Sequence, residues 1–223
     1  MRPASGTFLT AFGVCTGALL AVGCLAGPHA YLSLSGDYRL PAEYADAATY
    51  LELHDTWLRT SPLGLEGAVG AVLEDPVLGS ALIAFEASRS KTPGGPGQAA
   101  AEAWDRLYRG GERLPVRVRW RFNKHFHEEH TISPDSGWKF SLTDDRGLSL
   151  QPVEIGKMSA SRDARDWLGE FRLWFPRSSI DGRRYMTNRT RTLTLTIVGV
   201  PGDTSLTWRF LPLLDAPDAG TLQ

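Results

Sequence analysis

The second half of the chain alternates between apolar and polar residues with a period of two. In the clearest run, Val116, Val118, Trp120 and Phe122 alternate with Arg117, Arg119 and Arg121. Similar alternation recurs over residues 138–142, 148–150, 171–175, 193–197 and 206–210. Successive side chains of a strand point to opposite faces, so each run predicts a strand with one buried face and one solvent-exposed face. Six short strands separated by turn residues indicate an antiparallel sandwich or open barrel.

The first half has helical spacing instead. Apolar residues recur every three or four positions from residue 44 to 58, and the same spacing returns over 77–88 and 99–108. Asp75 followed by Pro76 is typical of an N-cap and the first turn of a helix. These patterns predict helices across this half of the chain.

The apolar run 63–73 is also interpreted as a helix. Gly64, Gly67 and Gly70 interrupt it, and each lowers the helix propensity by up to about 1 kcal/mol. The predicted fold class is therefore α+β, with an N-terminal helical segment followed by an antiparallel β-sandwich of about six or more strands.

The N-terminal residues differ from the rest of the chain. Arg2 is the only charged residue before Asp37, and residues 8–23 are apolar and rich in glycine. A short positive segment followed by a short apolar one is typical of an export signal. An uncleaved membrane helix is the alternative, although the run is short and glycine-rich for a span.

Both cysteines lie in this segment, Cys15 inside the apolar run and Cys24 at its end. No cysteine follows, so the exported chain forms no internal disulfide. The sequence Ala-Val-Gly-Cys at 21–24 resembles the lipobox of bacterial lipoproteins. This resemblance implies that Cys24 receives a lipid such as palmitate, becomes the first mature residue and anchors the protein to a membrane of the cell envelope.

The residue after the cysteine adds a second implication of the same resemblance. It is Leu25 rather than Asp, which favours the periplasmic face of an outer membrane in lipoproteins of Gram-negative bacteria. The alternative is ordinary signal-peptidase cleavage after Ala26 or Ala30, which would release a soluble exported protein.

Charge changes sign along the chain, although the formal net charge is only −1. Residues 24–110 hold 6 Lys and Arg against 11 Asp and Glu, and residues 111–223 hold 17 against 14. This balance excludes a disordered polyelectrolyte and argues against a nucleic-acid partner. The expected organisation is a signal peptide (1–23), a tether (24–37), a helical segment (38–111), a β-sandwich domain (112–213) and a tail (214–223).

The densest group of potential metal ligands is the sequence HFHEEH, which contains His125, His127, Glu129 and His130. Imidazole and carboxylate groups are good zinc ligands. On a strand, His125 and His127 would point to the same face. The alternative is a solvated strand end without a cofactor, because neither HExxH nor HxxEH is complete.

The stripe of Arg117, Arg119 and Arg121 is a second candidate site. Three guanidinium groups on one strand face are suited to bidentate binding of phosphate or carboxylate. The expected partner is an anionic envelope component or an envelope protein. The alternative is a solvated strand face, on which arginine side chains cover the sheet and discourage edge pairing.

Catalytic motifs are lacking: the chain has neither GxSxG nor a phosphate-binding loop. His54 and Asp55 are neighbours, but adjacent helical positions do not share a face, so both are expected on the surface. The sequence therefore favours a non-enzymatic envelope lipoprotein acting as a binding or structural module. A metal-binding protein or metal-dependent hydrolase using His125, His127 and His130 is the alternative.

Overall fold

The computed structural model describes residues 48–64, 67–90, 98–123, 137–162, 166–187, 189–199 and 202–210. Within these residues the chain forms helices and antiparallel sheets, and strands predominate. The helices are α1 (Thr49–Trp57), α2 (Pro76–Ser90) and α3 (Gln98–Tyr108). The strands are β1 (Leu58–Leu63), β2 (Gly67–Leu73), β3 (Arg113–Asn123), β4 (Lys139–Asp144), β5 (Ser149–Leu150), β6 (Glu154–Ile155), β7 (Ser159–Arg162), β8 (Asp166–Pro176), β9 (Thr192–Val198) and β10 (Thr204–Arg209).

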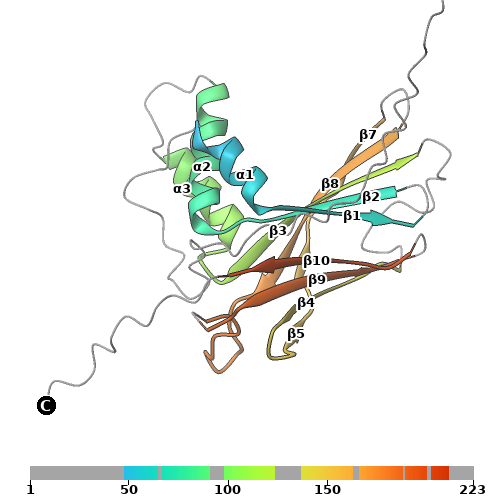
Figure 1. Ribbon diagram of the computed structural model, residues 1–223. Coiled ribbons are helices and arrows are strands. Elements are labelled where there is room, and N and C mark those ends of the chain that lie inside the picture. The colour runs from blue at the N-terminus through green and yellow to red at the C-terminus, as the bar shows by residue number, and fades with distance from the viewer. Residues whose placement is uncertain are drawn as a thin grey trace, which may run out of the picture.

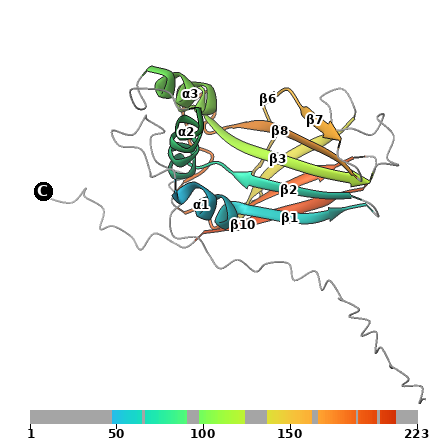
Figure 2. The ribbon, with the colours of Figure 1, turned by 90° about the horizontal axis from the view of Figure 1, so that it is seen from above.

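These strands form two antiparallel sheets. The first has the order β1-β2-β3-β8-β6, with β7 also paired to β8, and the second has the order β10-β9-β4-β5. The three helices gather at one end of the first sheet, on the side away from the second sheet (Figures 1 and 2). The helices therefore cover only part of that face.

The inward side chains of both sheets belong to one hydrophobic core. Along β3 the even-numbered residues from Leu114 to Phe122 are buried, as the period of two predicted. Inward residues of β8 and β9, among them Leu173 and Leu195, join the same core. Full burial of each such side chain stabilises the fold by about 1.5–3 kcal/mol. The strands predicted in the second half of the chain are confirmed.

Residues 58–73 form strands, so the predicted helix over 63–73 is wrong. β1 pairs with β2, and Gly64 has a φ of 65° in the turn between them, where glycine is favoured. Val69 faces the core, Val72 is buried on the opposite face of β2, and α1 contacts β2. Burial on both faces removes the alternation that identifies a strand in sequence.

The N-terminus of α2 is capped as predicted. The backbone N–H of Leu78 donates to Oδ1 of Asp75 at 2.9 Å, and the hydroxyl of Tyr108 in α3 donates to the Asp75 carbonyl at 2.6 Å. A Cβ on Gly79 would lie 1.8 Å from that hydroxyl oxygen. Glycine is therefore required where α2 approaches α3.

The Asp75 carboxyl is buried, and its Oδ2 has no hydrogen-bond partner within the described residues. Burial raises the pKa of Asp75 from 3.8 to about 7, against the opposing effect of the Leu78 and Val77 backbone N–H groups. The folded state thus holds the proton more tightly than the unfolded state. It follows that the contribution of Asp75 to stability declines as pH rises from about 4 to about 7.

Asp75→Asn should make the free energy of unfolding less dependent on pH. Asparagine keeps the capping acceptor but carries no charge. We expect the variant to exceed the wild type by on the order of 1 kcal/mol at pH 8 and to lose that advantage at pH 5. Urea unfolding at both pH values measures the effect, with the exposed Asp203→Asn as control. Parallel pH profiles for wild type and Asp75→Asn would contradict the assignment.

Candidate functional site

A buried carboxylate, that of Glu74, lies between two guanidinium groups. Nε of Arg172 donates to Oε2 of Glu74 at 2.6 Å, and Nη2 of Arg172 donates to Oε1 at 3.1 Å. Nε of Arg117 lies 3.1 Å from the same Oε1. The pairing of β3 with β8 places Arg117 directly opposite Arg172. A carboxylate between them offsets the repulsion of two like charges.

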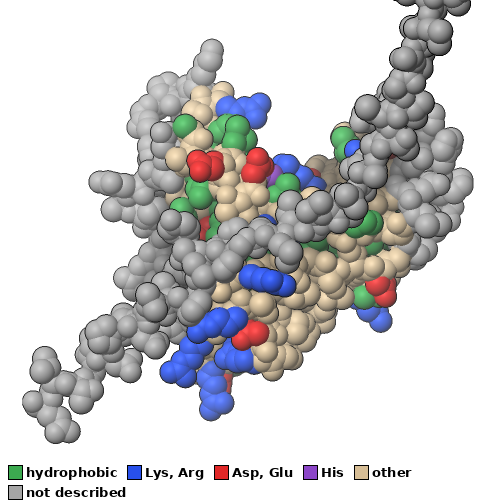
Figure 3. Space-filling view, viewed as in Figure 1, with side chains coloured by type: hydrophobic (Ala, Val, Ile, Leu, Met, Phe, Trp, Pro, Cys, Tyr) green, Lys and Arg blue, Asp and Glu red, His purple; other side chains and the backbone are tan. Residues whose placement is uncertain are grey.

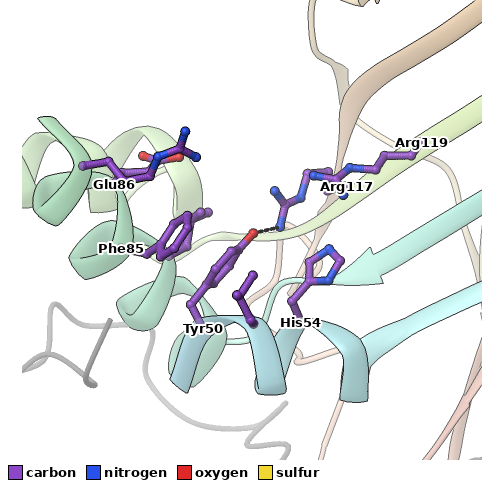
Figure 4. Close-up of a pocket in the computed structure, with 9 residues that line it drawn as sticks. Tyr50, His54, Phe85, Glu86, Arg117 and Arg119 are labelled. Carbon is purple, nitrogen blue, oxygen red and sulfur yellow. Dashed lines mark hydrogen bonds between the residues drawn. The ribbon is translucent and has the colours of Figure 1, made fainter. Parts of the chain in front are cut away.

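Arg117 is held on its other side by α1. Its Nη2 donates to the hydroxyl of Tyr50 at 2.8 Å (Figure 4), and its guanidinium lies 6.0 Å from the centroid of the Tyr50 ring. Burial alone would lower the pKa of Arg117, but Glu74 and Tyr50 raise it, and the net shift is upward. Arg117 is therefore a fixed, buried positive charge.

The neighbouring arginine on the same face, Arg119, forms an ion pair with Glu170 of β8. We call Arg117, Arg119 and Arg172, together with Glu74 and Glu170, the arginine cluster. Its charged groups leave one surplus positive charge. Because a buried charge is costly without a counter-charge, the surface beside the cluster favours an anion.

A pocket of about 660 Å³ borders the arginine cluster. The surface is hollowed beside the helices, with basic and histidine side chains in the hollow (Figure 3). Helix α1 supplies Tyr50, Leu51 and His54, helix α2 supplies Leu82, Phe85, Glu86 and Arg89, and strand β3 supplies Arg117 and Arg119. Figure 4 shows side chains of α1 and α2 facing the arginines of β3. The pocket forms where the helical layer ends on the sheet.

His54 is 8% exposed, so the prediction that it lies on the surface is wrong. Its Nδ1 lies 3.2 Å from Oδ1 of Asp55, and its Nε2 is buried without a hydrogen-bond partner within the described residues. Burial lowers the pKa of His54; the Asp55 hydrogen bond opposes this effect, and Arg117 and Arg119 add to it. The ring is therefore neutral at pH 7, with Nδ1–H assigned as the donor to Asp55.

The predicted arginine stripe does lie on one face of β3. Its side chains become more exposed away from the helices, from 6% for Arg117 to 49% for Arg119 and 64% for Arg121. Arg121 lies 3.7 Å from the carboxylate of Asp166. All three arginines thus have an acidic partner nearby, and anion binding by the stripe stays a prediction.

Other predicted site residues lie outside the described residues. They are Cys24, in the N-terminal part, and His125, His127, Glu129 and His130, in the connection from β3 to β4. Zinc binding and lipidation stay predictions.

The described ranges contain no group of three His, Cys, Asp or Glu side chains arranged to hold a metal ion. No helix there is long and apolar enough to cross a membrane.

Sequence reasoning did not identify Glu74, Tyr50 and His54 as site residues. The sequence gives one indication that Glu74 is special: this acidic residue interrupts an apolar stretch immediately before a helix cap. Tyr50 and His54 recur at a spacing of four on α1, which predicts a shared helical face but not its contact with an arginine.

No protein-family model matches the chain, and no curated protein matches it. The interpretation of the pocket therefore depends on its geometry and charge.

Glu74→Gln should destabilise the fold strongly. The variant leaves Arg117 and Arg172 close together without a counter-charge, and breaking a buried ion pair in this way costs about 3–5 kcal/mol. Urea unfolding at pH 7 measures the loss. Glu170→Gln is the matched control, because its partly exposed pair contributes less than about 1 kcal/mol. Equal losses in the two variants would show that Glu74 has no special role.

Proposed function

We propose that the protein is a cell-envelope lipoprotein that acts as a non-catalytic binding module for an anionic ligand. The observation that carries the proposal is the surplus positive charge of the arginine cluster beside a pocket. Carboxylate and phosphate groups match the planar donors of guanidinium, so they are the anions that this site favours.

Arg119 is the side chain of the cluster best suited to contact the ligand. It lines the pocket and is half exposed, whereas Arg117 is buried against Glu74 and Tyr50. A partly exposed ion pair such as that of Arg119 with Glu170 contributes little to stability. Little free energy is therefore lost when the Arg119 guanidinium turns towards an anion in the pocket.

The proposed location follows from the N-terminal sequence. Residues 1–23 direct export, Cys24 is acylated, and residues 24–37 tether the folded part to the membrane. Two or three acyl chains make such attachment effectively permanent. We propose further that the two sheets form a β-sandwich, with the helical segment packed beside it, on the periplasmic face of an outer membrane.

Arg119→Ala should weaken anion binding about tenfold. A hydrogen bond to a charged group contributes about 1.5–3 kcal/mol, and 1.4 kcal/mol corresponds to a tenfold change in affinity. The test titrates the full chain, in phosphatidylcholine nanodiscs, with inorganic phosphate at pH 7 by calorimetry. Arg209→Ala, at an exposed position on β10, is the control and should bind like the wild type. Equal loss in both variants, or a wild type that binds neither phosphate nor a carboxylate, refutes the site.

Lipidation predicts a specific mass for the membrane-bound protein. The product recovered from a bacterial membrane fraction should begin at Cys24 and carry acyl chains. Cys24→Ser should lack them, because serine provides no thiol for the lipid. Intact-mass spectrometry of both products is the measurement, and a soluble wild-type product beginning near Gly27 or Tyr31 would overturn the anchor.

A further inference from the structure

We infer that the ligand of the pocket is a small amphipathic monoanion, in which a carboxylate is joined to an aromatic or aliphatic body. The inference rests on the proposed function, because it names the ligand class of the same pocket. Two opposite walls of different chemistry support it, and both are visible in Figure 4.

The wall on β3 is basic and polar. Arg119 and Arg117 lie side by side there, and the neutral ring of His54 from α1 lies next to them. The opposing carboxylates, Glu74 and Glu170, do not cancel the charge of the arginine cluster. This wall therefore favours the anionic end of a ligand.

The helical wall is mainly apolar. The rings of Tyr50 and Phe85 stack with their centroids 4.8 Å apart and an interplanar angle of 28°. Leu82 on the same lining is buried, and Leu51 is 60% exposed. Covering Leu51 and the edges of the rings would remove apolar surface from water, which is the driving force expected for a hydrocarbon or aromatic group.

Tyr50 joins the two walls, since its hydroxyl accepts from Arg117 and its ring stacks on Phe85. The lining of the pocket thus changes from polar to apolar along the Tyr50 side chain. A ligand with an anionic end and an apolar body matches this change. Glu86 and Arg89 both line the helical wall, so this wall contributes no net charge, and the single surplus positive charge lies on the β3 side. The ligand is therefore expected to carry one charge, directed towards β3.

The size of the pocket supports a small molecule. Its volume of about 660 Å³ lies within the range of about 300–1,000 Å³ found for small-molecule sites. A folded protein partner would contact a broad surface instead.

The ligand class is tested with three probes on the full chain in phosphatidylcholine nanodiscs at pH 7: acetate, 3-phenylpropionate and the neutral 3-phenylpropionamide. Calorimetry or ligand-observed NMR gives each dissociation constant, with empty discs as the blank. We expect 3-phenylpropionate to bind at least about tenfold more tightly than acetate and than the amide, because only it engages both walls.

Leu51→Ser tests the apolar wall. Leu51 is largely exposed, so a loss of affinity in this variant is not explained by misfolding. The variant should weaken binding of 3-phenylpropionate about threefold and leave acetate unchanged. Ile180→Ser removes a fully exposed apolar side chain outside the pocket lining, and it should change neither affinity.

Each contrary result identifies which idea fails. Equal affinity for acetate and 3-phenylpropionate overturns the amphipathic class but leaves anion binding intact. Equal affinity for 3-phenylpropionate and its amide overturns the anionic end of the ligand. If neither the carboxylates nor phosphate binds, the proposed anion-binding function fails as well.

Discussion

The ion cluster around Glu74 is the constraint on which the arrangement of this molecule depends. One carboxylate neutralises parts of two guanidinium groups, which come from adjacent strands, and Arg117 in turn holds the hydroxyl of Tyr50 on α1. The backbone N–H of Glu74 also donates to the Pro115 carbonyl at 3.0 Å. These contacts connect α1, the end of β2, β3 and β8. Buried ion pairs add little net stability relative to apolar residues of similar volume, so we infer that the cluster here serves to select one register and one helix position.

The limited extent of the helical layer determines how the exposure of the arginine side chains changes along β3. Arg117 lies beneath the helices, Arg119 at their border and Arg121 beyond them, although all three occupy the same face of one strand. A uniform sequence pattern thus gives three environments. Arg117 supplies fixed charge, while Arg119 combines access to the pocket with a partner that it exchanges at little cost. The pocket is a consequence of the border, and the lining residues that the structure describes come from α1, α2 and β3.

Sequence patterns predicted those elements whose environment differs between two faces. The strands β3, β8 and β9 keep their alternation because most outward positions carry Arg, Glu or Thr, although Leu168 of β8 and Val198 of β9 are exposed apolar side chains. Helix α2 carries the cap of Asp75. The pattern failed at β2, whose two faces are buried by different layers. It also failed at the site. Glu74 and Arg172 are 98 residues apart, and Tyr50 and Arg117 are 67 apart. Contacts of this kind depend on sheet register and helix docking, for which periodicity carries no signal.

Unsatisfied polar atoms and surplus charge bear differently on the role of the arginine cluster. Such atoms are rare in buried regions. Within the described residues, buried side-chain atoms without a hydrogen-bond partner occur on His54, Asp75, Arg117 and Trp138. Two of these residues line the pocket, where the surplus positive charge also lies. Stability alone would favour a second carboxylate or an apolar pair at this position. The unsatisfied Nε of Arg117 lies 3.1 Å from the Glu74 carboxylate, and the Nε2 of neutral His54 is an acceptor that lacks a donor, so neither atom calls for an anion. The surplus positive charge of the arginine cluster is therefore what supports the proposed binding role.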